Sequence, residues 1–334
     1  MQDKFGRVFR DIRISVTDRC NFRCPYCMPA EIFGEKYAFL KRQDLLSYEE
    51  ITRILKILLS LGAAKVRLTG GEPLLRKDLD QLVQMIVGLE GVADLAMTTN
   101  AYLLDQHAQK LADAGLKRIT VSLDSLDDEV FQKMNGQRAS VADVLRGIAA
   151  AQTAGFEPIK INAVVQRGVN DHTLVELANY CRQEGHILRF IEYMDVGTGN
   201  GWKMDDVVSA DEILALLQAQ IPLVELESEY AGEVARRYAY ADGSGEIGLI
   251  TSVTKPFCGA CTRMRLSAEG KIYTCLFASK GVDLKAPLRE GASDLDLETI
   301  LRDTWGKRVD RYSELRHQNK HNPDEKIEMF HIGG

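Results

Sequence analysis

Apolar and polar positions follow a strand-then-helix rhythm along the first two thirds of the chain. Short apolar runs, typical of buried strands, alternate with longer stretches in which apolar residues recur every three to four positions. Six runs are predicted as strands: RISV (13–16), VRLT (66–69), LAMTT (95–99), RITVSL (118–123), IKINAVV (159–165) and ILRFIEYM (187–194). Strands that alternate with helices pair in parallel through right-handed crossovers, so the pattern predicts an α/β fold, as an open sheet or a partial barrel.

The stretches between these strands predict helices. Ser47 and Glu50 have the spacing of a capping box before ITRILKILLSLG (51–62). Four further helical stretches are expected: 78–90, 103–115, one that ends near Ala154, and 171–185. In both candidate folds, ligands bind at the carboxyl ends of the strands, so the polar residues that follow each strand are candidates for the site.

The rhythm breaks after GTGNGW (197–202). Shorter strand-like runs follow at 235–241 and 246–253, between helical patterns near 210–219 and 295–305. We therefore expect two domains, residues 1–225 with the strand–helix repeat and residues 226–334 with a β-rich fold and a Gly-Gly tail.

Composition narrows the functional classes. The chain is 45% hydrophobic and 27% charged, with a net charge of −6, which is typical of a globular protein and gives no reason to expect nucleic acid as a partner. No apolar run reaches the ~18 residues that span a bilayer, and MQDKFGRVFR lacks the apolar core of a signal peptide. We expect a cytoplasmic protein without membrane contact, in which thiols stay reduced. The phosphate-binding motif G-x4-GK[ST] of P-loop hydrolases does not occur.

Three thiols lie directly after the first predicted strand. Cys20, Cys24 and Cys27 have the spacing C-x3-C-x2-C within CNFRCPYCMP. Tetrahedral zinc sites and ordinary iron–sulfur clusters take four ligands, so three cysteines leave one position open. A structural zinc site or a group of buried thiols is the alternative interpretation.

The first triad resembles the signature of the radical S-adenosylmethionine superfamily, including the aromatic residue Tyr26 before the last cysteine. TGGEP (69–73), at the end of a predicted strand, is similar to the superfamily's motif for the methionine moiety. The resemblance implies a [4Fe–4S] cluster held by three thiolates, with the fourth iron open to S-adenosyl-L-methionine. Glycines at this motif would allow close backbone approach to a ligand.

A second triad comprises Cys258, Cys261 and Cys275, spaced C-x2-C-x13-C. The remaining cysteine, Cys181, lies on an amphipathic helix and is predicted to be a buried structural thiol. The alternative for the second triad is a zinc site that recruits Cys181 or a downstream histidine, the candidates being His317, His321 and His331.

The combination resembles one family nearly end to end, the GTP 3′,8-cyclases of molybdenum cofactor biosynthesis. The similar segments are both triads, CGACTRMRLSAEGKIYTC (258–275), VSLDSLDDEVF (121–131), FIEYMDVG (190–197), DRYSELR (310–316) and Gly333-Gly334. The resemblance implies a TIM-like incomplete (βα)6 barrel, with a second [4Fe–4S] cluster in a C-terminal β-rich region. It also implies conversion of GTP to (8S)-3′,8-cyclo-7,8-dihydro-GTP, with guanine bound to the open iron of the second cluster.

The resemblance assigns contacts residue by residue. The S-adenosylmethionine contacts it implies are Tyr26, Gly71, Ser122 and Met194. The GTP contacts it implies are Arg13, Arg67, Thr98, Lys160, Arg263, Met264 and Arg265. From the residues themselves, arginines within strands suit a triphosphate, and alternation places Arg263 and Arg265 on one face. The sequence departs from the family at Ala101, where glycine is expected. No side chain is assigned as a conventional acid or base.

The resemblance also implies partners: an external flavodoxin- or ferredoxin-like one-electron donor, the next enzyme of the pathway, and a second copy of the chain in a homodimer. It implies that the Gly333-Gly334 tail reaches into the active site. Two alternatives stay open at this stage. One is another two-cluster radical enzyme, such as a peptide-modifying maturase, and the other is a zinc- or cluster-bearing binding protein without catalysis.

Overall fold

The structure, a computed structural model, describes residues 1–230, 232–316 and 326–334. All six predicted strands of the first region are present. They are β1 (Asp11–Ser15), β2 (Lys65–Thr69), β3 (Asp94–Thr99), β4 (Arg118–Ser122), β5 (Lys160–Val165) and β6 (Ile187–Glu192). They pair in parallel, each with the next in chain order, as the strand–helix rhythm predicts.

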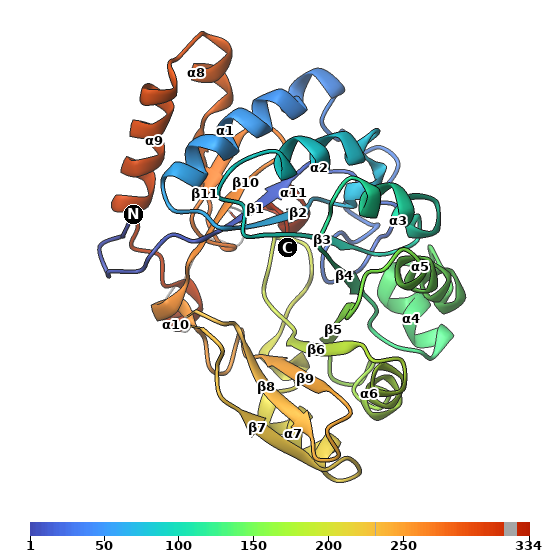
Figure 1. Ribbon diagram of the computed structural model, residues 1–334. Coiled ribbons are helices and arrows are strands. Elements are labelled where there is room, and N and C mark those ends of the chain that lie inside the picture. The colour runs from blue at the N-terminus through green and yellow to red at the C-terminus, as the bar shows by residue number, and fades with distance from the viewer. Residues whose placement is uncertain (231, 317–325) are drawn as a thin grey trace.

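Strands from the second region extend this sheet at both ends. The additional strands are β7 (Leu223–Leu226), β8 (Ala235–Tyr240), β9 (Glu246–Ile250), β10 (Arg263–Leu266), β11 (Lys271–Tyr273) and β12 (Val282–Asp283). The strand order is β12-β11-β10-β1-β2-β3-β4-β5-β6-β9-β8-β7. β10 runs parallel to β1 and β9 parallel to β6, whereas the outer strands are antiparallel. In the described part of the chain the two outer strands do not pair, so the barrel is incomplete, as predicted (Figure 1).

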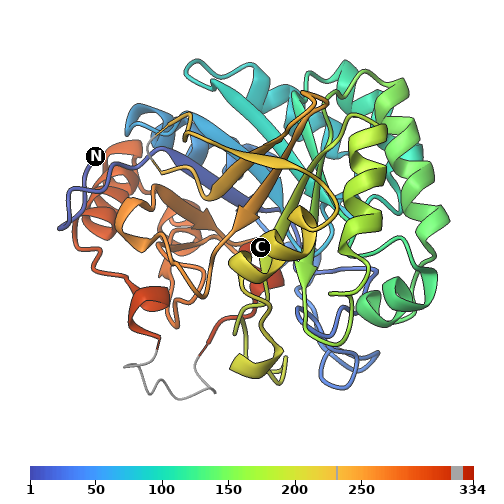
Figure 2. The same ribbon diagram turned by 90° about the horizontal axis from the view of Figure 1, so that it is seen from below.

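Helices cover the outer surface of the curved sheet (Figures 1 and 2). Those of the barrel are α1 (Tyr48–Ser60), α2 (Leu79–Val87), α3 (Leu104–Asp113), α4 (Asp128–Asn135), α5 (Val141–Thr153) and α6 (Leu174–Gln183). The later helices are α7 (Ala210–Gln218), α8 (Lys285–Arg289), α9 (Asp294–Gly306), α10 (Tyr312–Leu315) and α11 (Met329–Ile332). The predicted capping box of Ser47 and Glu50 starts α1. All the helices in the described ranges are too short or too polar to span a bilayer.

One predicted helical stretch is two helices. The sequence suggested a single stretch ending near Ala154, but α4 ends at Gly136, whose φ of +72° stops the helix. A side chain there would also collide with the Arg23 carbonyl, because an added Cβ would lie 2.4 Å from that oxygen. Ser140 then caps the start of α5. The break seats the end of α4 against the loop that carries the first thiol triad.

The hydrophobic core fills the space between the sheet and the helices. α1 buries Ile51, Ile54 and Leu58, and α9 buries Trp305 against Phe9 at a ring distance of 5.2 Å. Burial of such side chains stabilises each by roughly 1.5–3 kcal/mol relative to exposure. The concave side of the sheet is different, since it carries charged and polar residues. The C-terminus ends near the middle of the molecule, beside α11 (Figures 1 and 2).

Candidate active site

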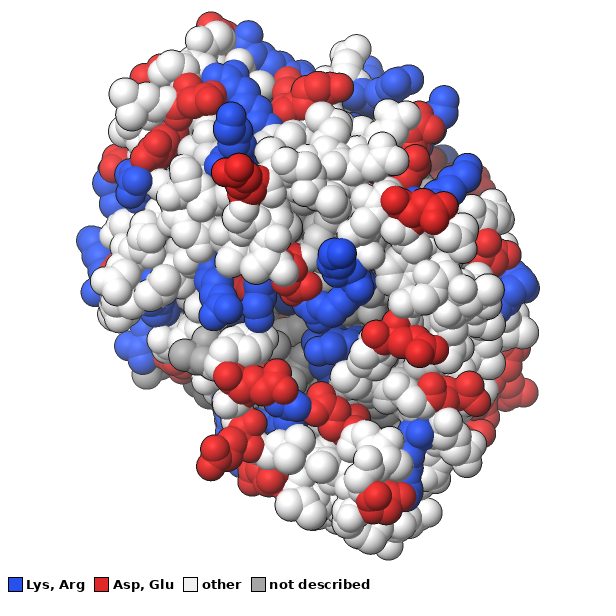
Figure 3. Space-filling view, in the orientation of Figure 1, with Lys and Arg blue, Asp and Glu red and all other residues white. Residues whose placement is uncertain are grey.

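A cavity of about 300 Å³ lies against the concave side of the sheet and takes its lining from both ends of the chain. All six cysteines of the two triads line it. In the space-filling view, lysine and arginine side chains gather around a hollow near the middle of one face (Figure 3). The structure thus brings together two thiol groups that are more than 200 positions apart in the sequence.

The two triads lie at opposite ends of the parallel strands. Cys20 and its two partners follow β1, at the carboxyl end where the fold was expected to place its ligands. Cys258 and Cys261 instead precede β10, which runs parallel to β1, and so lie at the amino end. Cys275 follows β11, which is antiparallel to β10 and returns to that same end. Because a strand of five residues is about 16 Å long, the cavity connects two thiol sites roughly that far apart.

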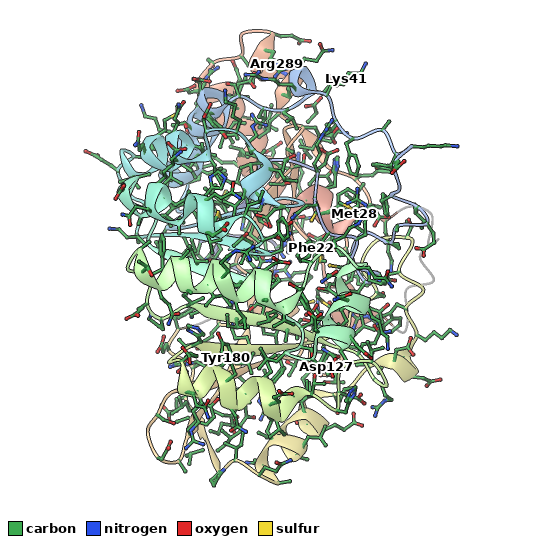
Figure 4. All side chains as sticks on the ribbon, turned by 90° about the vertical axis from the view of Figure 1, so that its right-hand side faces the viewer. Phe22, Met28, Lys41, Asp127, Tyr180 and Arg289 are labelled. Atoms are coloured by element: carbon green, nitrogen blue, oxygen red, sulfur yellow. The ribbon has the colours of Figure 1, made fainter. Side chains whose placement is uncertain are left out.

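The first triad lies in a tightly turned loop after β1. The backbone N–H groups of Cys27 and Met28 both donate to the Cys24 carbonyl, at 2.9 and 2.8 Å. All three thiols are free and partly buried. The N–H of Phe22 lies 3.4 Å from the Cys20 sulfur. Phe22 and Met28, which flank the triad, lie in the interior, whereas Lys41 and Arg289 lie at the surface (Figure 4).

Without a metal, these thiols are expected to stay protonated. Burial raises the pKa of Cys20 to about 12 and raises the pKa values of Cys24 and Cys27 well above the ordinary value. A buried thiol loses its proton when a metal ion supplies the compensating positive charge. No fourth cysteine joins this group among the described residues. Three thiols with an N–H donor directed at one sulfur fit the three protein ligands of an open [4Fe–4S] cluster.

The GGEP segment packs directly against the chain that leads into the first triad. The N–H of Gly71 donates to the Thr17 carbonyl and that of Glu72 to the Arg19 carbonyl, at 2.8 and 2.7 Å. A Cβ on Gly71 would lie 2.2 Å from the Arg19 oxygen. The glycines therefore allow two loops to approach each other closely. From the sequence, these glycines were explained only by the close approach of a ligand. Gly71 also lines the cavity.

Glu72 and Asp124 are buried carboxyls beside the first triad. Glu72 accepts hydrogen bonds from Thr99 and from the Asn100 backbone, at 2.7 and 2.8 Å, and burial raises its pKa to about 7. Asp124 accepts a hydrogen bond of 2.8 Å from the Tyr26 hydroxyl, and burial raises its pKa to about 6. Both carboxyls tie residues near the cysteines to the ends of neighbouring strands.

The four residues matched to S-adenosylmethionine contacts all line the cavity: Tyr26, Gly71, Ser122 and Met194. Ser122 ends β4, and Met194 follows β6. Ala101, where the family pattern has glycine, adopts a φ of +61°, in the left-handed region that glycine favours. The turn after β3 thus keeps a glycine-like geometry despite the substitution.

The second triad is held by two buried arginines. Arg7 donates to the Cys258 carbonyl and Arg308 to the Cys261 carbonyl, at 2.9 and 2.8 Å. Burial acts to raise the pKa of the Cys261 thiol, but the guanidinium groups of Arg263 and Arg308 outweigh it and lower that pKa to about 6. These thiols are also free. The chemistry of the donors again fits a metal cluster.

The zinc alternative for the second triad lacks a fourth ligand in the described structure. Cys181 is a fully buried thiol of α6, as predicted, and does not line the cavity. His331 lies 3.1 Å from Glu269, and His317 and His321 fall outside the described residues. No three His, Cys, Asp or Glu side chains in the described ranges are arranged to hold a single metal ion. A cluster of several irons does not need its ligands to converge on one point.

A row of arginines crosses the cavity between the triads. Strand pairing places Arg13 beside Arg67 on one side and beside Arg265 on the other. Residues 263–266 form β10, so alternation along the strand puts Arg263 and Arg265 on one face. Burial, followed by repulsion from the neighbouring arginines, lowers the pKa of Arg13 well below its ordinary value and that of Arg265 to about 10. No carboxylate forms an ion pair with any of these four arginines within the described part of the chain. Such uncompensated cations suit a polyanion.

The remaining matched GTP residues have different positions. Arg67 donates to Thr98 at 2.9 Å, and both line the cavity. Lys160 pairs with Thr120 across β4 and β5 and is not part of the lining, and burial together with Arg189 lowers its pKa to about 8. Met264 points to the opposite side of β10 from Arg263 and Arg265 and is fully buried in the core.

The structure adds residues that the sequence interpretation missed. Arg189 of β6 lines the cavity and donates to Asn162 at 3.0 Å. Its signal was present, since it is an arginine inside a predicted strand, as Arg13 and Arg67 are. Arg308 and Asn100 also line the cavity, but they follow no pattern in the sequence that marks them.

The C-terminal tail lies at the cavity. Gly334 is part of the lining, and the Ile332 carbonyl lies 3.5 Å from the Arg265 guanidinium. Gly333 has a φ of +76°, and a Cβ there would lie 2.2 Å from the Thr69 side chain. The close fit of the two glycines beside GGEP agrees with the expectation that the tail reaches the site.

Solved structures share this fold. SuiB of Streptococcus suis bound to the precursor peptide SuiA superposes with a TM-score of 0.60 at 17% identity, over 97% of this chain and 72% of that chain. The S-adenosylmethionine-bound form of SuiB has a TM-score of 0.59 at 17% identity, over 96% and 72% of the two chains. At such low identity the likeness concerns the fold alone.

Family models and curated relatives are more specific. The radical SAM superfamily model matches residues 14–181, and the Molybdenum Cofactor Synthesis C model matches residues 186–314. The GTP 3′,8-cyclase of Acidothermus cellulolyticus is 50% identical, over 100% of this chain and 99% of the relative. That of Xanthomonas axonopodis pv. citri is 51% identical over 100% and 99%, and that of Staphylococcus epidermidis is 47% identical over the same shares. With two thiol triads and a row of buried arginines in one cavity, this chain belongs to the GTP 3′,8-cyclase family of radical SAM proteins.

Proposed function

We propose that this protein converts GTP to (8S)-3′,8-cyclo-7,8-dihydro-GTP, in a radical S-adenosylmethionine-dependent reaction that begins molybdenum cofactor biosynthesis. The observation that carries the proposal is one cavity with a thiol triad at each end and, between them, a row of arginines that form no ion pair among the described residues. This arrangement suits a substrate with a polyanionic part and a part that reaches toward metal. A peptide substrate would not require the row of arginines.

The first triad, Cys20, Cys24 and Cys27, would hold a [4Fe–4S] cluster, and Cys258, Cys261 and Cys275 would hold a second one. With S-adenosylmethionine, the first cluster would supply the one-electron chemistry for removal of a hydrogen atom from C3′ of GTP, and the residues of the cavity would hold C3′ in position. In this proposal, residues 1–225 form the radical domain and residues 226–334 bring the second cluster and part of the GTP site.

The protein's own residues bind and orient. Arg13, Arg67 and Arg265 are side by side on three neighbouring strands and would hold the triphosphate by charge-assisted hydrogen bonds. Lys160 of β5 and Arg189 of β6 would add positive charge farther along the sheet, beyond β3 and β4. Tyr26, Gly71, Ser122 and Met194 would contact S-adenosylmethionine at the carboxyl ends. An oriented substrate in a secluded cavity accounts for selective attack at one ribose carbon without a conventional acid or base.

Three further matched residues take different roles. Thr98 fixes Arg67 through their 2.9 Å hydrogen bond. Met264 would contribute to the GTP site through its backbone, because its side chain lies in the core. Lys160 acts through charge, close to the cavity.

The test is anaerobic turnover of the cluster-loaded protein with dithionite, S-adenosylmethionine and GTP. We expect 5′-deoxyadenosine, methionine and the cyclised nucleotide by liquid chromatography and mass spectrometry, and about eight irons per chain from two four-iron clusters. Zinc with negligible iron would contradict the proposal and support the binding-protein alternative. Formation of 5′-deoxyadenosine with a peptide but not with GTP would support a maturase instead.

Three further assignments belong to the same proposal. An external flavodoxin- or ferredoxin-like donor supplies the electron, and stimulation of turnover by reduced flavodoxin in place of dithionite tests it. The next enzyme of the pathway consumes the product. The protein acts in the cytoplasm as a homodimer, which light scattering of the cluster-loaded protein in solution tests.

A further inference from the structure

Two segments that resemble the family and lie more than 100 positions apart in the sequence meet in one buried network. FIEYMDVG (190–197) contributes Asp195, and DRYSELR (310–316) contributes Tyr312 and Arg316. Tyr312 donates its hydroxyl to Asp195 at 2.6 Å, and the Arg316 Nε donates at 2.9 Å. Only 8% of Asp195 and 9% of Arg316 are exposed, so the pair is shielded from water.

A second cation completes the network from the C-terminal side. The Lys326 Nζ donates to the Asp195 carboxylate at 3.0 Å and to its carbonyl at 2.7 Å. Burial acts to raise the pKa of Asp195, but Tyr312, Arg316 and Lys326 outweigh it and hold the pKa below its ordinary value. One carboxylate therefore compensates two buried cations, and both charges would lose their counterion if it were neutralised.

Each partner of Asp195 leads to a different part of the site. The Tyr312 ring stacks on Phe277, with ring centres 4.3 Å apart, and the Phe277 N–H lies 3.5 Å from the Cys275 sulfur. Tyr312 thus connects Asp195 to the second thiol triad. Arg316 also donates to the carbonyls of Ser252 and Val253, just after β9, at 3.4 and 3.5 Å.

Lys326 leads to the C-terminal tail. Two residues later, the Glu328 carboxylate accepts hydrogen bonds from the Thr198 N–H and hydroxyl, at 2.9 and 2.6 Å. Gly197 leaves room for the carboxylate in this position, because a Cβ there would lie 2.0 Å from Glu328 Oε2. Six residues after Glu328 the chain ends at Gly334 in the cavity lining. The loop after β6 therefore holds the start of the tail at two points.

The loop that contains Asp195 also forms part of the cavity wall. Tyr193 and Met194 line the cavity. The Asn200 side chain donates to the Met194 carbonyl at 3.0 Å, and the Trp202 indole donates to the Tyr193 carbonyl at 2.9 Å. These bonds make residues 193–202 one connected unit, so a displacement of Asp195 would be transmitted to Met194.

We infer that Asp195 is a positioning residue, which holds the loop carrying Met194, the segment carrying Cys275 and the C-terminal tail in fixed relation through Tyr312, Arg316 and Lys326. The inference rests on the proposed function, since Met194 lies on the side assigned to S-adenosylmethionine and Cys275 on the side assigned to GTP. Asp195 itself is not part of the cavity lining. Asp195 keeps the part of the site assigned to S-adenosylmethionine and the part assigned to GTP in a fixed relative position.

The test is Asp195→Asn in the cluster-loaded enzyme, which keeps the side-chain shape and removes the charge. A misplacement of about 1 Å can cost up to about a hundredfold in rate, so we expect the cyclised nucleotide to fall about tenfold or more. We expect 5′-deoxyadenosine to fall less, because Met194 is the one proposed S-adenosylmethionine contact on the Asp195 loop, whereas the first triad, Tyr26, Gly71 and Ser122 lie on other segments. The ratio of 5′-deoxyadenosine to cyclised product should therefore rise, and a general loss of folding would not produce this rise.

A second readout does not depend on turnover. The chain has two tryptophans, of which Trp305 is fully buried and Trp202 belongs to the Asp195 loop. Acrylamide quenching of fluorescence therefore reports mainly on Trp202, and we expect stronger quenching in Asp195→Asn. Tyr312→Phe, which removes one hydrogen bond and keeps the ring on Phe277, should change both readouts in the same direction by less.

Glu50→Gln is the matched control. It is the same acid-to-amide change in a partly buried ion pair, with Arg289 at 2.7 Å, outside the cavity lining. It should leave the product ratio and the quenching at wild-type values. If Asp195→Asn fails to load iron, the product ratio and the quenching of Tyr312→Phe decide whether the inference holds.

Unchanged ratio and quenching in iron-loaded Asp195→Asn would overturn the inference, as would a parallel loss of both products. If the wild-type protein cleaves S-adenosylmethionine but does not cyclise GTP, the proposed function fails. Trp202 quenching then still decides whether Asp195 fixes its loop.

Discussion

Replacement of Arg189 by methionine is expected to stabilise the nucleotide-free protein and to weaken GTP binding. Arg189 projects from β6 into the cavity and donates only to neutral groups, Asn162 at 3.0 Å and Thr120 at 3.5 Å. Burial, followed by repulsion from Arg67 and Arg118, lowers its pKa from 12.5 to about 9. A cation with a lowered pKa is less stable in the folded protein than in water, so its removal should favour folding.

The magnitude follows from that pKa. At about 1.4 kcal/mol per pKa unit, keeping Arg189 charged costs about 5 kcal/mol at most. Because the side chain still touches water in the cavity, we expect about 1–3 kcal/mol and a rise in melting temperature of about 2–6 °C. Loss of a charge-assisted hydrogen bond to phosphate is worth about 1.5–3 kcal/mol, so GTP should bind roughly 10–100-fold more weakly.

The assay is thermal denaturation of the cluster-loaded protein with and without GTP, together with calorimetric titration. Arg7→Met is the contrasting variant, because Arg7 is more deeply buried than Arg189 and is paired with Asp3. Breaking that pair should destabilise the protein by about 3–5 kcal/mol. The reasoning is refuted if Arg189→Met lowers the melting temperature as Arg7→Met does. It is also refuted if GTP stabilises Arg189→Met as much as it stabilises the wild type.

Three further predictions concern other parts of the site. The pKa of Lys160 is lowered to about 8, so Lys160 loses its proton above pH 8 and GTP affinity should fall by up to about tenfold per pH unit. Binding titrations across this pH range should show no such fall in Lys160→Arg. Gly71→Ala would place a Cβ 2.2 Å from the Arg19 carbonyl, so iron analysis should show the loss of about four of eight irons, those of the first cluster. Gly306→Ala, where a Cβ meets open space, should keep all of them. Cys24→Ala should abolish S-adenosylmethionine cleavage, whereas Cys261→Ala should leave cleavage measurable and chiefly impair the use of GTP. Analysis of 5′-deoxyadenosine and of the nucleotide products distinguishes the two results.

The barrel strands and the thiol triads could be predicted because their signals are local. Each strand is a short apolar run with its own flanking turns, and each triad has at least two cysteines within four positions. The arginines in β1 and β2 could also be predicted as cavity residues, because a charged side chain within a buried strand needs a structural or functional explanation. The same rule applied to ILRFIEYM would have identified Arg189.

The rest depends on contacts between distant residues. Arg13 and Arg265 become neighbours only because β10 pairs with β1, and no spacing along 252 positions encodes that pairing. Asp195 is unremarkable in the sequence, because its partners come from two segments more than 100 positions later. The end of α4 at Gly136 likewise reflects packing against Arg23, which a helical pattern does not register.

The pairing of β10 with β1 also explains why one cavity holds two incomplete triads. Ligands of parallel α/β folds usually lie at the carboxyl ends of the strands, where Cys20, Cys24 and Cys27 lie. A parallel β10 carries Cys258 and Cys261 to the opposite end, because they precede this strand whereas the first triad follows β1. The row formed by Arg265, Arg13 and Arg67 then lies between the triads by register alone. Under the proposed function, a substrate whose anionic part binds in this row would have one end facing each triad, so this register would place both proposed metal sites beside the same molecule.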